Sequence, residues 1–281
     1  MDVYSGAISI LLLPQMVNPI SSSAPFINTS KTAFMQRIAD LVRAKHTMYM
    51  QGQVDRRRAG ALARKFGAMF PTNLDKVAAY RARLHGNATA RLLFLYQHPS
   101  DMLHWILLYH SGTAPDMSGQ TWRDALSDKI VLTGYELVRH TRPGFAQPAW
   151  SWRYTHNQLS GLRQDVVNAI RLKNDHQLRQ LIDSLVRSPG FALVRKQVAS
   201  LTALVRAEWL RRRGKAEPIP EIPKHGYTRR VADAGVWLYE LDSHIAKHSK
   251  AGEASVTLPR PRSSKRNPKR ASGKSTSEKT Q

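Results

Sequence analysis

The chain of 281 residues carries 43 Lys and Arg against 20 Asp and Glu, a net charge of +23 at pH 7, and 42% of its residues are hydrophobic. This length and apolar fraction suffice for one large domain or two small ones with a buried core, and no apolar run approaches the roughly 18 residues of a membrane span. The absence of cysteine excludes disulfides, thiolate zinc sites and a cysteine nucleophile.

The positive charge is clustered along the chain. Residues 31–96 have a net charge of +10, residues 187–230 of +8 and the tail from Pro259 of +7, whereas residues 97–186 have only +1. Clusters of one sign are typical of surfaces that bind phosphates. The sequence therefore predicts a polyanionic partner.

The first third of the chain is expected to be helical and basic. Residues 1–30 contain Ser, Pro and Asn and are interpreted as a disordered leader. Apolar residues at helical spacing then predict three helices, from Thr32 to Met48, from Asp55 to Pro71 and from Asn73 to Leu84. Residues 31–90 would form a basic helical segment, which is also compatible with a helix-turn-helix unit.

The middle of the chain, residues 91–156, is expected to form a sheet. Two apolar runs, 91–96 and 103–110, are typical of buried strands, and residues 121–127 predict a short helix. Two further runs, 130–138 and 149–155, are separated by a Pro-Gly break and predict an antiparallel pair with a long loop. Together these runs predict about four strands in one antiparallel sheet.

Helix is expected again over residues 157–248. Its clearest apolar stripe follows Ser188-Pro189 and runs from Phe191 to Trp209, closed by Gly214. Residues 251–281 are interpreted as a disordered basic tail. The predicted fold class is therefore α+β, a central antiparallel sheet of about four strands flanked by N- and C-terminal helical segments in a single domain over residues 31–250.

The candidate phosphate contacts are basic side chains on the predicted helices of both flanking segments. In the N-terminal segment they are Arg56, Arg57, Arg58, Arg64, Lys65, Arg81 and Arg83. In the C-terminal segment they are Arg195, Lys196, Arg206, Arg211, Arg212 and Arg213. Through these residues the protein is expected to bind nucleic acid, double-stranded DNA in preference to RNA.

Enzymatic alternatives are less well supported by motifs. Asp124, Asp128 and Glu136 could gather around Mg²⁺ in a nuclease, and His176-x-x-Arg179 followed by Tyr227 or Tyr239 has a spacing found in tyrosine recombinases. No zinc-binding His pair and no glycine-rich phosphate loop occurs, so we expect no metal, cofactor or catalytic residue. A third hypothesis is a structural role in which the cations match an acidic protein surface.

Three segments carry a resemblance to known proteins. Gly134–Arg139, Trp150–Arg153 and Pro189–Val198 look like parts of uncharacterised basic accessory proteins of bacterial plasmids and integrative conjugative elements. The similarity covers roughly residues 31–240. It implies an accessory role in replication, transfer or maintenance of a mobile genetic element, without catalysis. The protein would be cytoplasmic and nucleoid-associated, with possible protein partners in a DNA-processing complex and no membrane partner.

Overall fold

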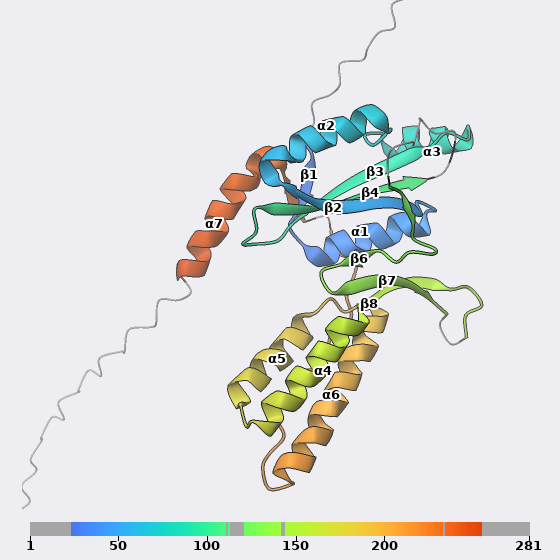
Figure 1. The fold of residues 1–281 in the computed structure, drawn as a ribbon. Coiled ribbons are helices and arrows are strands. Elements are labelled where there is room, and N and C mark those ends of the chain that lie inside the picture. The colour runs from blue at the N-terminus through green and yellow to red at the C-terminus, as the bar shows by residue number, and fades with distance from the viewer. Residues whose placement is uncertain (1–23, 111, 113–120, 142–143, 233, 255–281) are drawn as a thin grey trace, which may run out of the picture. The chain divides into compact units, whose positions relative to one another are not determined.

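The computed structural model describes residues 24–254 apart from residues 111, 113–120, 142–143 and 233 (Figure 1). The chain divides after Leu241 into two compact units, and we describe each by itself. Helix α7 (Leu241–Ala254) begins at the last residue of the first unit, and its residues 242–254 are the described part of the second unit. In the described part of the chain, no helix combines the length and apolar character needed to span a bilayer.

A six-stranded sheet with the strand order β5-β2-β4-β3-β1-β9 organises the first unit. Its strands are β1 (Phe26–Asn28), β2 (Met48–Asp55), β3 (Thr89–Tyr96), β4 (Met102–His110), β5 (Arg123–Asp124) and β9 (Gly235–Trp237). The long strands β2, β4 and β3 are antiparallel. β1 adds to β3 in parallel and pairs with β9 in antiparallel orientation, so the sheet is mixed.

Helices cover both faces of the sheet. On β4, Ile106 and Leu108 belong to the core beneath α1 (Lys31–Arg43), while Leu107 and Tyr109 belong to the core beneath α2 (Ala59–Met69). Because successive side chains of a strand point to opposite faces, a strand buried on both faces is a continuous apolar run. This explains why β3 and β4 lack a polar alternation.

A smaller sheet, with the order β6-β7-β8, lies against the opposite side of α1 (Figure 1). Its strands are β6 (Val131–Leu132), β7 (Tyr135–His140) and β8 (Ala149–Tyr154). Thr133 and Gly134 join β6 to β7 with φ angles of 39° and 83°, a left-handed two-residue turn that favours glycine. The indole N–H of Trp152 donates to the carbonyl of Met35 at 2.8 Å, which fixes α1 to the small sheet.

Three helices, α4 (His156–Arg171), α5 (Asp175–Arg187) and α6 (Ala192–Arg213), form a bundle beside β8 (Figure 1). The apolar stripe of α6 is buried between the small sheet and α4 and α5, which confirms the prediction for this helix. The Gln197 side chain of α6 accepts from the Tyr154 N–H at 2.7 Å and donates to its carbonyl at 3.2 Å. An amide side chain therefore occupies the place of a further strand at the edge of the small sheet.

The α+β class is confirmed, but the prediction of one antiparallel sheet of about four strands is wrong. The predicted pair 130–138 and 149–155 is antiparallel and forms β7 and β8, in a sheet separate from β3 and β4. α1 lies between the two sheets, so their strands cannot pair. The expected short helix at 121–127 contains β5 instead.

The predicted helix Thr32–Met48 ends early. Lys45 adopts a left-handed conformation with φ of 66°, after which β2 begins at Met48 and enters the large sheet. The segment 31–90 is therefore not a run of three helices, and its two later helices, α2 and α3 (Lys76–Leu84), follow a strand. Strand β2 separates α1 from α2, so the three helices do not follow one another as a helix-turn-helix unit requires.

The chain ends also differ from expectation. Residues 26–28, placed in the leader, form β1, while residues 1–23 lie outside the described part. The end of the segment 157–248, predicted to be helical, contains β9 and a 3-10 turn η2 (Leu238–Glu240) before α7 begins. Residues 251–254 of the expected tail belong to α7, and residues 255–281 lie outside the described part.

Candidate nucleic-acid interface

The predicted N-terminal contacts lie on one structural layer. We call residues 56–84 the α2–α3 layer; it comprises the 3-10 turn η1 (Arg56–Arg58), α2 and α3. Phe66 and Phe70 anchor it on the large sheet. The Arg91 side chain of β3 donates to the carbonyls of Thr72 and Leu74, which holds the link between α2 and α3 in place.

Most cations of this layer face solvent. Arg57, Arg58, Arg64, Lys65 and Arg81 are exposed, and none forms an ion pair with the described residues. The two other predicted contacts differ: Arg83 is half-buried, and Arg56 pairs with Asp101 at 3.3 Å. Five of the seven N-terminal candidates are thus available to an external anion.

The carboxylates next to these cations are engaged elsewhere. Asp55 accepts a hydrogen bond from the Arg57 backbone N–H at 2.8 Å, and Asp75 accepts from the Ala78 N–H at 2.7 Å. Both therefore cap helix starts, where an acceptor satisfies an otherwise unpaired N–H. They support the helices that display the cations and, within the described part of the chain, do not pair with the exposed guanidinium groups.

The C-terminal candidates on α6 divide into two groups. Lys196, Arg206 and Arg212 are exposed and form no ion pair within the described part of the chain. Arg195 is half-buried, with its guanidinium 5.6 Å from the centroid of the Tyr227 ring. Arg211 and Arg213 have carboxylate partners.

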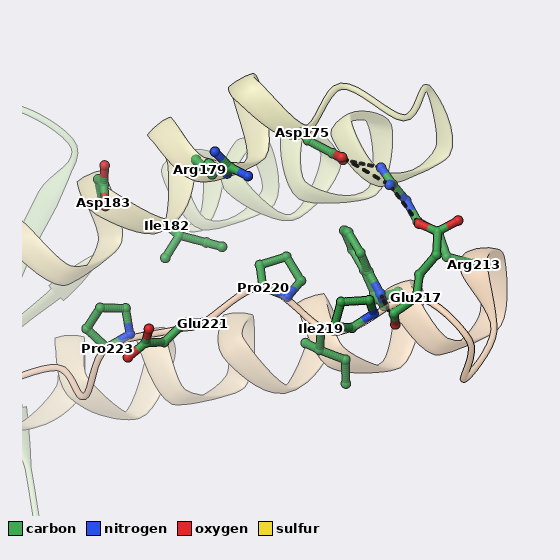
Figure 2. Close-up of a pocket in the computed structure, with 12 residues that line it drawn as sticks. Asp175, Arg179, Ile182, Asp183, Arg213, Glu217, Ile219, Pro220, Glu221 and Pro223 are labelled. Atoms are coloured by element: carbon green, nitrogen blue, oxygen red, sulfur yellow. Dashed lines mark hydrogen bonds and ion pairs between the residues drawn. The ribbon is translucent and has the colours of Figure 1, made fainter. Parts of the chain in front are cut away.

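Arg213 has a structural role. Its side chain is only 4% exposed, forms ion pairs with Asp175 and Glu217, and lies 4.1 Å from the centroid of the Trp209 ring (Figure 2). The hydrogen bond to Asp175 is the main cause that raises the pKa of Arg213. The prediction that this guanidinium contacts phosphate does not fit its burial, because its donors are already directed at carboxylates within the bundle.

Arg211 is also partly neutralised. It remains largely exposed but pairs with Glu208, whose side chain is 7% exposed. A phosphate would have to compete with this carboxylate for the guanidinium. Arg211 is therefore a weaker candidate than its neighbour Arg212.

A groove of about 710 Å³ beside Arg213 is acidic. Chain segments 217–223, α5 and α6 form its walls, and Figure 2 shows Asp175, Asp183, Glu217 and Glu221 around it. Only two cations, Arg179 and Arg213, line the same groove. Four carboxylates against two guanidinium groups disfavour a polyanion at this face of the bundle.

Two acidic residues of the nuclease alternative, Asp128 and Glu136, are paired with cations. Asp128 lies 3.5 Å from Arg123, and Glu136 bonds Arg153 at 2.6 Å and Lys129 at 3.3 Å. Among the described residues, no group of three or more His, Cys, Asp or Glu could hold a metal ion. His176 and Arg179 are exposed on α5.

Known proteins add no further evidence on the site. Comparison of the chain with protein families, curated proteins and solved structures finds no match.

The sequence did not predict the difference between the capping carboxylates of the α2–α3 layer and the pairing carboxylates of the bundle. Asp55 and Asp75 at helix starts were the available signal for capping, whereas the pairing of Asp175 with Arg213 spans 38 residues.

Proposed function

We propose that the protein binds nucleic acid, duplex DNA in preference to RNA, with the α2–α3 layer as the main contact surface. The observation that carries this proposal is the set of five exposed cations on that layer, which have no ion-pair partner among the described residues while the adjacent carboxylates cap helices. Unpaired surface Lys and Arg bind phosphates with release of counterions from the nucleic acid.

A second feature of α3 supports a nucleic-acid partner. Val77, Tyr80 and Leu84 are exposed at helical spacing, next to Lys76 and Arg81. Nucleic acid offers phosphates beside apolar sugar and base surfaces, and proteins use apolar side chains against these together with cations. The exposed stripe and its flanking charges match such a partner.

The biological role we propose is that of an accessory protein of a mobile genetic element, acting in replication, transfer or maintenance without catalysis. It would act in the cytoplasm on nucleoid-associated DNA, alone or with protein partners. Lys196, Arg206 and Arg212 would extend the phosphate contacts, and the basic tail would add affinity that is independent of sequence.

The test is equilibrium binding of the full chain to labelled duplex DNA, single-stranded DNA and RNA of equal length across a salt series. We expect duplex DNA to bind most tightly, with an affinity that falls linearly on a log–log plot against salt. A chain ending at Ala254 lacks eight Lys and Arg of the tail and should keep a steep salt dependence. Loss of all binding with the tail would exclude the α2–α3 layer, and tighter binding of RNA would overturn the preference for duplex DNA.

A further inference from the structure

A second cationic feature involves none of the residues of the α2–α3 layer. It is a pocket of about 390 Å³ lined by the start of α1, the β6–β7 turn with the start of β7, the end of β8 with the start of α4, and the end of α5. Four separate stretches of chain therefore converge on it, residues 31–32, 133–135, 154–162 and 184–189. Its volume lies in the lower part of the roughly 300–1,000 Å³ typical of small-molecule sites.

The lining of this pocket selects for anions. Its eleven residues include Lys31 and Arg187 but no Asp or Glu, and seven of them end in a hydroxyl or side-chain amide group. Neither cation forms an ion pair within the described residues. The pocket thus carries two uncompensated positive charges surrounded by neutral hydrogen-bonding groups.

Lys31 is held in an environment that favours a bound anion. It is half-buried, and its Nζ lies 4.5 Å from the centroid of the Tyr135 ring. Burial lowers the pKa of Lys31, since no carboxylate compensates for the lost water. Lys31 is also the first residue of the 13-residue helix α1, whose N-terminal end adds a positive partial charge.

Tyr135 and Tyr154 supply a hydroxyl donor. They face each other across β7 and β8, with ring centroids 4.8 Å apart and exposed fractions of 6% and 5%. Burial raises the pKa of Tyr135, and the neighbouring Tyr154 acts in the same direction, so the phenol stays protonated. A protonated phenol has an O–H that can donate to a ligand.

We propose that this pocket binds a phosphate monoester, with Lys31 and Arg187 balancing its charge and the tyrosine pair donating to a phosphate oxygen. A monoester carries a charge of about −1.5 to −2 at pH 7, which matches the two cations better than a carboxylate would. The ester could belong to a free nucleotide or to the phosphorylated 5′ end of a nucleic-acid strand. The proposal does not depend on DNA binding by the α2–α3 layer.

The experiment is calorimetric titration of the full chain with four ligands in two matched pairs. AMP is compared with adenosine, and a 5′-phosphorylated thymidine dinucleotide is compared with the same dinucleotide bearing a 5′-hydroxyl. We expect each phosphorylated ligand to bind at least about tenfold more tightly than its partner. Tighter binding of the dinucleotide phosphate than of AMP assigns the site to strand ends, and the reverse order assigns it to free nucleotides. Equal binding within each pair would overturn the proposal.

Variants locate the binding. Lys31→Met removes the half-buried charge and should weaken AMP binding at least tenfold, and Arg187→Gln should weaken it severalfold. Arg163→Gln removes one exposed charge from α4 outside the pocket and serves as the control, with unchanged binding. Tyr135→Phe keeps the stacked ring and removes one O–H, which provides a severalfold effect even if Lys31→Met fails to fold. AMP affinity unchanged in Tyr135→Phe and Arg187→Gln would overturn the assignment. Duplex DNA binding by these variants should stay as in the parent, so the two proposals can fail separately.

Discussion

The α2–α3 layer and the helical bundle are both rich in cations but use them differently. The layer, residues 56–84, has eight Lys and Arg and one acidic residue, Asp75, which caps α3. The bundle, residues 156–213, has eleven Lys and Arg and four acidic residues, two of which, Asp175 and Glu208, pair with Arg213 and Arg211. The charge excess is therefore similar in the two regions, but among the described residues three cations of the bundle, Arg171, Arg211 and Arg213, pair with carboxylates, against Arg56 alone in the layer.

The contrast arises from where each carboxylate lies. A carboxylate at a helix start accepts from backbone N–H groups and leaves neighbouring guanidinium groups unpaired. A carboxylate on the face of a packed helix is within reach of a cation on the next helix, and both then support the fold. Net charge along a sequence therefore does not show which of its cations are paired with carboxylates in the fold.

The largest expected effect is the loss of DNA binding when the layer is neutralised. Replacement of Arg57, Arg58, Arg64 and Lys65 by Ala should lower the slope of log affinity against log salt by up to about 3.6, since each phosphate contact contributes about 0.9. At low salt we expect the affinity for duplex DNA to fall about 100- to 1,000-fold. Fluorescence anisotropy across a salt series measures both quantities.

The control for this variant removes the same charge elsewhere. Arg163, Arg179, Lys215 and Lys224 are exposed and form no ion pair within the described part of the chain. Their combined replacement by Ala should change the slope by less than about 1. Equal slopes for the two fourfold variants would mean that net charge, and no particular surface, governs binding.

Sequence patterns predicted the helices of the bundle better than the strands of the large sheet. α6 is long and has an unbroken apolar stripe, so its period is readable from local sequence alone. β1 and β9 have three residues each, too few for a period, and pair with strands remote in sequence. Gly52 lies in β2 opposite Trp105, whose ring would be 3.1 Å from an added Cβ, a contact that no local pattern indicates.

The candidate site was predictable in position but not in detail. The basic clusters identified the right elements for solvent-exposed cations such as Arg64 and Lys196. Which cations are neutralised depends on contacts such as Arg213 with Asp175, which no local pattern encodes. The proposed phosphate pocket could not be predicted from the sequence, because Lys31, Tyr135 and Arg187 are brought together only by tertiary packing.

The next-largest expected effect is a loss of folding stability at acidic pH, and it should be confined to the large sheet and the residues packed against it. His46 lies beside β3 with its Nε2 3.3 Å from the Thr89 hydroxyl, and it is buried against His110. Burial lowers its pKa to about 4, assisted by the charges of His110 and Arg83. Between about pH 6.5 and pH 4 the unfolded chain binds a proton that the folded chain does not, so stability falls as the pH decreases through this window.

The expected loss from His46 is about 3 kcal/mol of unfolding free energy between pH 7 and pH 4. His46→Gln keeps a polar side chain next to Thr89 and should remove most of that loss, as measured by urea unfolding at both pH values. Hydrogen exchange at pH 4.5 should show faster opening of β3 and β4 than of α6 in the parent protein. The same pH dependence in His46→Gln would show that other groups set the acid limit.

The smallest effects are expected from Arg212 and Arg213, which are adjacent on α6 but differ in their pairing with carboxylates. Arg213→Ala removes two ion pairs and the contact with Trp209. We expect the unfolding free energy to fall by only about 1–2 kcal/mol, because Asp175 and Glu217 are each about half exposed and water screens their charges. Arg212→Ala should change stability by less than about 0.5 kcal/mol but lower the salt slope of DNA binding by about 1. Urea unfolding and the salt series, applied to both variants, test this crossed pattern. A decrease in the salt slope for Arg213→Ala as large as that for Arg212→Ala would mean that Arg213 leaves Asp175 and Glu217 to contact DNA. The distinction between the bundle and the α2–α3 layer would then not hold at this end of α6.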